Sequence, residues 1–150
     1  CSGQVQKLTE ALDREVKIDE IYQCLLDTYV VDPEPYRLVD YDLLPGREQD
    51  QRCVARVAVS ENVLTIDGEG SGPIEAFVTA LGETLNEPVT ILSYQEVGIG
   101  TGSDAQAVCI VAIEDKEEGG RCYGLGLSRN TTTTALNAII SAMNRRWAAA

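Results

Sequence analysis

The feature that most constrains the fold is an order of three strand-like segments and one helix-like segment that occurs twice, over about residues 36–86 and 88–148. Helices that come only after every third strand pack on one face of an antiparallel sheet. The sequence therefore predicts an α+β fold built from duplicated β-β-β-α units, in which antiparallel sheets carry helices on one face.

The segments themselves are predicted from the spacing of their apolar residues. Alternation with a period of two indicates strands, and a stripe at helical spacing indicates a helix. In the first unit the pattern predicts strands at 36–43, 52–59 and 63–68 and a helix at 73–85. In the second unit it predicts strands at 89–97, 105–113 and 121–127 and a helix at 131–147.

Apolar residues at helical spacing in residues 1–31 predict a short helical hairpin before the duplicated unit. Pro33 and Pro35 follow it, and each proline biases the residue before it toward extended geometry. We therefore expect a linker here, with a hairpin at 1–31 and a main domain at 36–150.

The second face of the predicted sheets also carries apolar side chains, which need cover. These residues are Val54, Ala58, Val108, Ile110 and Ala112. Burial between two subunits would supply that cover, so we expect a homodimer.

Composition and charge exclude several classes of partner. Twelve Lys and Arg residues stand against 24 Asp and Glu, a formal net charge of −12, which argues against nucleic acid and against anionic membrane surfaces. No apolar stretch approaches the ~20 residues of a membrane span, and no signal-peptide pattern is present. The five cysteines form no CxxC pair and are predicted to be reduced core residues. A cytoplasmic location is expected.

The chain contains no histidine. Serine or cysteine nucleophiles paired with histidine, and metal sites with histidine ligands, are therefore excluded. The acidic residues at 114–118 lie in a predicted turn and are expected to be solvated. We expect no catalytic residue, no metal ligand and no cofactor in this chain, and we expect it to bind a small molecule without transforming it.

A run of glycines at residues 68–72 precedes the first predicted helix of the duplicated unit. Glycine allows positive φ and close approach of the backbone to a ligand. Pro73 suits the first helical position, and the helix start presents free N–H groups and a partial positive charge. A tight strand-to-helix turn with no ligand is the alternative interpretation. The second glycine-rich loop, 98–102, leads into a strand and lacks the spacing of a dinucleotide loop.

Several motifs, taken in order, carry a resemblance to a known family. They are Gly70-x-Gly72-Pro73-Ile74-x-Ala76, Ser93-Tyr94, Asp104-Ala105-Gln106-Ala107, Gly124-Leu125-Gly126 and a closing helix with Ala135, Ala138 and Ala142-Met143-Asn144. Over about residues 36–147 the sequence resembles the C-terminal regulatory domain of 2-isopropylmalate synthase, and the predicted hairpin resembles the end of that family's linker subdomain. The family more often has Asn at the position of Ser71.

The resemblance implies feedback control of leucine biosynthesis. In that family a separate (β/α)₈ barrel condenses acetyl-CoA with 2-oxoisovalerate and needs a divalent metal, while the regulatory domains dimerise and bind leucine. The implied partners are therefore leucine, a second copy and an upstream catalytic barrel, and the chain itself is expected to be non-catalytic. The alternatives are an isoleucine-binding domain of citramalate synthase, a pure dimerisation module, or an unrelated small enzyme that uses carboxylates.

The resemblance also suggests a leucine site near the dimer interface, where the two repeats meet. The backbone around Gly70, Ser71, Gly72 and Pro73 would hold the α-carboxylate at the helix start, and Asp104 is a candidate partner for the ammonium group. The positions that match the family's apolar pocket are Ile74, Ala76, Ile91, Tyr94 and Ala105.

Overall fold

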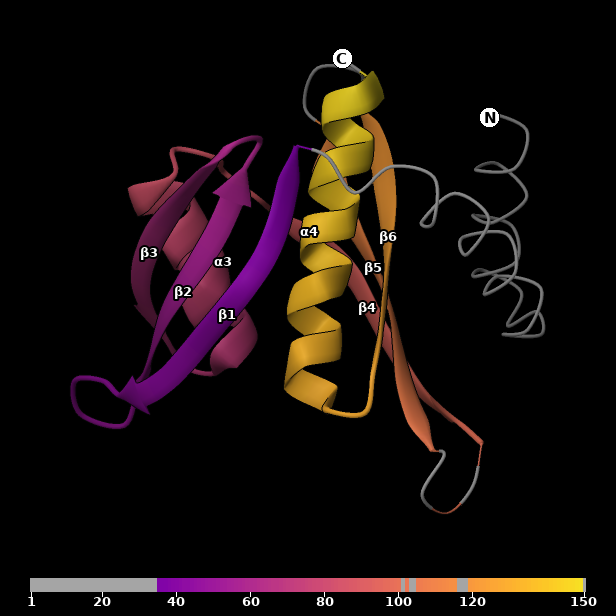
Figure 1. Cartoon of the computed structure of the whole chain (residues 1–150), viewed down its shortest axis with the longest axis horizontal. Helices are drawn as coiled ribbons and strands as arrows, with labels where there is room; N and C mark the ends of the chain where they lie inside the picture. The colour runs from indigo at the N-terminus through magenta and orange to yellow at the C-terminus, as the bar shows by residue number, and fades with distance from the viewer. Residues whose placement is uncertain (1–34, 101, 103–104, 116–118, 150) are drawn as a thin grey trace.

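Two three-stranded sheets, each followed by one helix, make up the part of the chain that the structure describes (Figure 1). The computed structural model describes residues 35–100, 102, 105–115 and 119–149. The elements are β1 (Tyr36–Pro45), β2 (Gln51–Val59), β3 (Asn62–Gly70), α3 (Pro73–Thr84), β4 (Ile91–Ile99), β5 (Gln106–Asp115), β6 (Gly120–Ser128) and α4 (Thr131–Ala149). The predicted α+β duplication is confirmed. The hairpin predicted at 1–31 lies outside the described residues.

Both sheets are antiparallel meanders, in the order β1-β2-β3 and β4-β5-β6. Helix α3 packs on β3 and β2 of its own repeat, and α4 packs on β6 and β5. Helix α4 also contacts β1, so it lies between the two sheets (Figure 1). The second helix therefore joins the two repeats into one body.

The core lies between the sheets and the helices. The apolar stripe of α3 buries Phe77 and Leu81 completely, and α4 buries Leu136, Ile139 and Met143 to 1% exposure or less. The inward faces of β2 and β5 meet these stripes with Ala55, Val57, Cys109, Val111 and Ile113. The periodicity that predicted the elements is thus the periodicity of burial.

Two tight turns end elements of the first repeat. The predicted turn between β2 and β3 is confirmed, with Ser60 at φ 56°. After α3, Asn86 takes φ 58° and the N–H of Glu87 bonds back to the carbonyl of Leu81 at 3.0 Å. Asparagine tolerates the left-handed region, so it ends the helix and turns the chain toward β4.

The glycines of β3 and β6 are required by close packing against the helices. A Cβ atom at Gly68 would lie 2.3 Å from the backbone nitrogen of Ala80, and one at Gly126 would lie 1.8 Å from the carbonyl oxygen of Thr134. Glycine also allows positive φ, but no residue of the run at 68–72 adopts it, since positive φ occurs among described glycines only at Gly100, Gly102 and Gly119. The run instead gives the helix room to approach the sheet.

Side chains of α4 bind the backbone of β1. The Nδ2 of Asn144 donates to the carbonyl of Tyr36, and its Oδ1 accepts the Tyr36 N–H, both at 2.8 Å. The hydroxyls of Tyr41 and Thr133 form a further hydrogen bond of 2.7 Å between the same two elements. Asn144 is buried, so a two-way bond here is strongly favoured over leaving the groups unpaired.

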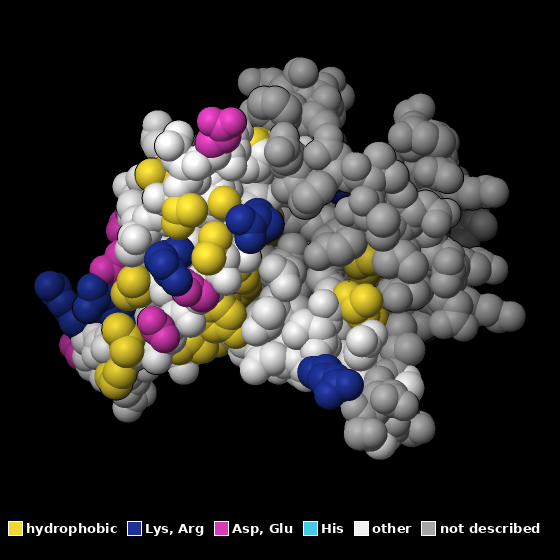
Figure 2. Space-filling view, in the orientation of Figure 1, with side chains coloured by type: hydrophobic (Ala, Val, Ile, Leu, Met, Phe, Trp, Pro, Cys, Tyr) yellow, Lys and Arg dark blue, Asp and Glu magenta, His cyan; other side chains and the backbone are white. Residues whose placement is uncertain are grey.

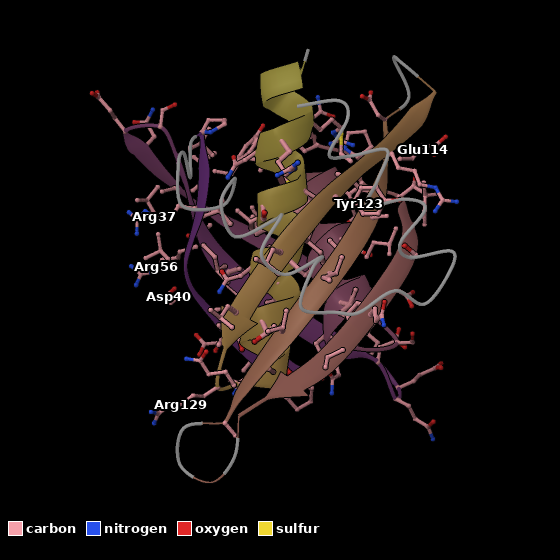
Figure 3. The ribbon with its side chains drawn as sticks, turned by 90° about the vertical axis from the view of Figure 1, so that its right-hand side faces the viewer. Arg37, Asp40, Arg56, Glu114, Tyr123 and Arg129 are labelled. Atoms are coloured by element: carbon pink, nitrogen blue, oxygen red, sulfur yellow. The ribbon has the colours of Figure 1, made fainter. Side chains whose placement is uncertain are left out.

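The outward faces of the two sheets differ in character. On β1–β3, ion pairs cross between strands: one joins Arg52 to Asp67, and the other joins Arg56 to Asp40 (Figure 3). Figure 2 shows basic and acidic side chains interspersed with hydrophobic ones on this side of the molecule. Each arginine lowers the pKa of its partner carboxyl, chiefly by hydrogen bonding. Because the pairs are exposed, we assign them little stability.

The outward face of β5 and β6 is apolar instead. The side chains of Val108, Ile110 and Ala112 are at most 2% exposed, and the neighbouring Tyr123 and Leu125 are 1% exposed. On the first sheet, Ala58 is also buried and Val54 is half-buried. The expectation that a second subunit covers this set stays a prediction. In the part of the chain that the structure describes, no helix is long and apolar enough to cross a membrane.

Replacing Gly126 with alanine should destabilise the fold by about 3 kcal/mol, because the new methyl group would overlap a backbone carbonyl of α4 that cannot move aside alone. Urea unfolding measures the change. The control is Gly82→Ala, within α3, where a Cβ meets nothing within 4 Å. That substitution should stabilise the helix by about 0.5–1 kcal/mol. Equal effects of the two would contradict the packing role.

Candidate functional site

The turn from β3 into α3 leaves the start of the helix without a side-chain cap. Gly72 is the N-cap residue, with extended backbone (φ −155°, ψ 179°), and Pro73 is the first helical residue. The carbonyl of Gly72 accepts the N–H of Ala76 at 2.9 Å, but Gly72 has no side chain to accept the N–H groups of the first turn. These donors and the helix dipole favour an anion in front of the helix.

The start of α4 is different, although the two helices occupy corresponding places in the repeats. There the Oδ1 of Asn130 accepts the N–H of Thr133 at 3.0 Å, and the hydroxyl of Thr134 donates to the carbonyl of Asn130 at 2.9 Å. An asparagine cap satisfies donors that α3 leaves open. Only the first repeat therefore presents an uncapped helix start.

An open pocket of about 500 Å³ lies beside the uncapped start of α3, within the size range of small-molecule sites. Its walls are mostly apolar, with a polar edge at the turn. The lining residues are Ser71, Gly72, Pro73, Ile74, Glu75, Val78 and Ile91. The pocket thus combines backbone donors for an anion with a wall suited to a branched aliphatic group.

The pocket lies between α3 and β4. In the other repeat the corresponding helix, α4, packs against β1. Hydrogen bonds of Thr133 and Asn144 fasten α4 to β1. At the corresponding place in the other repeat, Val78 of α3 and Ile91 of β4 line the hollow. A contact that is filled in one repeat is left open in the other.

Five of the ten predicted site residues line this pocket, namely Ser71, Gly72, Pro73, Ile74 and Ile91. Gly70 and Ala76 lie beneath it: both are buried, and a Cβ at Gly70 would come within 2.7 Å of the backbone nitrogen of Ala76. These two residues hold the first turn of α3 against the end of β3. They shape the pocket without lining it.

The remaining predicted residues lie elsewhere. Tyr94 is on the same face of β4 as Ile91, is 43% exposed and lies outside the pocket wall. Ala105 is exposed next to the Ile99↔Gln106 pair, at the opposite end of the β4–β5 hairpin from Ile91. Nine strand residues separate the two ends, about 25 Å along the strand. Asp104 is outside the described residues.

Sequence reasoning missed Glu75 and Val78, which also line the pocket. Val78 belongs to the apolar stripe of α3, so its spacing assigned it to the core. It follows Ile74 by four residues, and that spacing places both on one face of a helix. Glu75 gives no sequence signal beyond being an acidic residue in a first helical turn.

A group of interacting side chains on β4 and β5 contains Tyr94, Glu96 and Cys109. The Tyr94 hydroxyl donates to Oε2 of Glu96. Burial, followed by this hydrogen bond, raises the pKa of Tyr94. Cys109 faces Glu96 across the β4–β5 pair, and burial together with the nearby carboxylate raises its pKa to about 12.

Neither buried cysteine of the described chain is an activated nucleophile. Burial raises the pKa of Cys53 to about 11, as it does that of Cys109, so both thiols stay protonated near neutral pH. Among the described residues, no cluster of three or more Cys, Asp or Glu side chains could hold a metal ion.

The sequence matches a known family model and several known enzymes. A family model described as the LeuA allosteric (dimerisation) domain matches residues 15–147. A 2-isopropylmalate synthase of Brucella suis biovar 1 is 33% identical over 144 residues, which cover 94% of this chain and 26% of that protein. The 2-isopropylmalate synthases of Ralstonia nicotianae and Clostridium acetobutylicum are 32% and 30% identical over 146 residues, covering 96% and 94% of this chain and 25% and 26% of those proteins. The chain spans about a quarter of the length of these relatives.

Replacing Cys109 with alanine should reduce the loss of stability at alkaline pH. In the folded chain its pKa is about 12, against an ordinary value of 9.0 that applies in the unfolded chain. Between these values the unfolded state binds fewer protons, so the free energy of unfolding falls as the pH rises. Urea unfolding at about pH 7 and about pH 10 should show a larger fall for the unaltered chain than for C109A. Equal falls would contradict a buried, neutral thiol.

Proposed function

Because the chain belongs to the LeuA allosteric (dimerisation) domain family, we propose that it senses leucine for a 2-isopropylmalate synthase, and that leucine occupies the pocket at the β3–α3 turn. The observation that carries the proposal is the pairing of an uncapped helix start with a branched apolar wall in one pocket. Both halves of a small aliphatic amino acid find complementary surroundings there.

The α-carboxylate would lie in front of α3, where the first-turn N–H groups and the helix dipole favour a negative charge. The isobutyl group would pack on Ile74, Val78 and Ile91. Burying an aliphatic side chain of this size against such a wall contributes about 1.5–3 kcal/mol. A single methylene changes that contribution by about 1–3 kcal/mol, so the wall discriminates among branched amino acids only modestly.

A second copy of the chain is expected to complete the site. The described family is a dimerisation domain, and β4 is an edge strand whose Leu92 and Tyr94 are 42% and 43% exposed. Edge strands with exposed apolar side chains are ready surfaces for pairing. Ala105 is about 25 Å along β4 from Ile91. If Ala105 contacts leucine, we therefore expect that residue to come from a second copy of the chain.

Inhibition would follow from a difference in leucine affinity between two states of the longer protein, since a ligand shifts an equilibrium only through such a difference. The condensation of acetyl-CoA with 2-oxoisovalerate, and its divalent metal, are assigned to a catalytic barrel that precedes this domain. The signal would pass through the segment before β1, including Pro33 and Pro35. This chain contributes recognition and no reacting group, and a cytoplasmic location is expected for such an enzyme.

Leucine should bind the isolated chain and stabilise it. At a leucine concentration 100 times the dissociation constant, the free energy of unfolding should rise by about 2.7 kcal/mol. Calorimetry with leucine, isoleucine and valine measures affinity and selectivity together. Preference for isoleucine would indicate the regulatory domain of a citramalate synthase instead, and a folded dimer that binds none of the three would indicate a pure dimerisation module.

The substitution Gly72→Val should weaken leucine binding by at least about tenfold, or 1.4 kcal/mol, because the side chain would enter the pocket. The fold should survive, since Gly72 has extended backbone and a Cβ there meets nothing within 4 Å. The loss of a good N-cap residue should cost less than about 1 kcal/mol.

Gly98→Val is the matched control for this substitution. A Cβ at Gly98 also meets nothing within 4 Å, and the residue lies toward the end of β4 opposite Ile91. Leucine affinity, measured by calorimetry, should be unchanged in G98V. Unchanged affinity in G72V would exclude the turn as the place where leucine binds.

A further inference from the structure

The proposed pocket contains one ionisable side chain among its lining residues, the carboxylate of Glu75. A negative charge there is unfavourable for a ligand that is only an anion. We infer that Glu75 holds the ammonium group of the ligand and thereby distinguishes an amino acid from the 2-oxo acid with the same carbon skeleton. This inference rests on the proposed leucine site and names the residue that gives it chemical selectivity.

The position of Glu75 fits this role. It is an exposed residue in the first turn of α3, next to Ile74, which lines the apolar wall. The Ser71 hydroxyl donates to Oε2 of Glu75. This bond holds the carboxylate near the β3–α3 turn, and among the described residues none donates to Oε1. One carboxylate oxygen is thus anchored while the other is open to a donor.

The two charges of an α-amino acid are carried on one carbon atom, so their partners must lie close together. Here the helix-start donors and the Glu75 carboxylate belong to the same helical turn. A zwitterion can place its carboxylate before the helix and its ammonium against Glu75. A 2-oxo acid has no ammonium group to donate to Glu75, and its carboxylate adds an uncompensated negative charge near that of Glu75. Its aliphatic part fits the wall of Ile74, Val78 and Ile91 equally well.

The apolar wall therefore cannot distinguish the amino acid from the 2-oxo acid, and the selectivity depends on the carboxylate of Glu75. An amino acid is formed from its 2-oxo acid by amino-group transfer. A sensor selective in this way responds only after that transfer has occurred. It would ignore an accumulating precursor that has the same branched skeleton.

The test is calorimetry of the full 150-residue chain with leucine and with 4-methyl-2-oxopentanoate. The unaltered chain should bind leucine at least about tenfold more tightly than the 2-oxo acid, as expected for one charged hydrogen bond. E75Q should lose about tenfold in leucine affinity while its affinity for the 2-oxo acid stays equal or increases. The amide keeps the shape of the side chain and removes its charge, and thermal unfolding checks that E75Q is folded.

The matched control is E83Q, which removes the same charge from an exposed position in the last turn of the same helix, away from the pocket. Both affinities should be unchanged in E83Q. Leucine affinity in E75Q equal to that of the unaltered chain would overturn the inference, as would a loss in D104N that E75Q does not share. If the unaltered chain binds neither ligand, the leucine site itself is wrong and the inference falls with it.

Discussion

The contact on which the rest of the structure depends is the close approach of helix backbone to strand backbone at the glycines of β3 and β6. At Gly68, Gly124 and Gly126, even a methyl group would overlap main-chain atoms of the helix packed above. Because no side chain separates the layers there, each helix is fixed in height and register over its sheet. The first turn of α3 is fixed in the same way by Gly70 and Ala76, and this contact sets the floor of the pocket.

The order of elements was predictable because burial in this fold follows simple periods. Alternation in β2 and β5, and the stripes of α3 and α4, correspond directly to buried positions. The role of the glycine run was not predictable in the same way, since a glycine permits positive φ and close packing equally well. Only the structure distinguishes these two roles, and it shows close packing at Gly68 and Gly70.

The candidate site was predictable where it is local in the chain. Residues 71–74 line the pocket because one turn places them together, and Ile91 joins them from the next strand. Glu75 and Val78 were missed because an acidic first turn and an apolar stripe have ordinary structural explanations. The position of Ala105 was not predictable, because its distance from Ile91 depends on the register of the β4–β5 hairpin. Sequence spacing carries no information about which end of a hairpin faces a helix.

The hydrogen bonds between Asn144 and Tyr36 have a mechanical consequence. Tyr36 is the first residue of β1, immediately after Pro35, and its N–H and carbonyl are both held by one side chain of the last helix. A pull on the chain at its entry into the domain is therefore resisted by these two bonds to α4 as well as by the pairing of β1 with β2. The point where the chain enters the domain is thus coupled directly to the last helix of the second repeat.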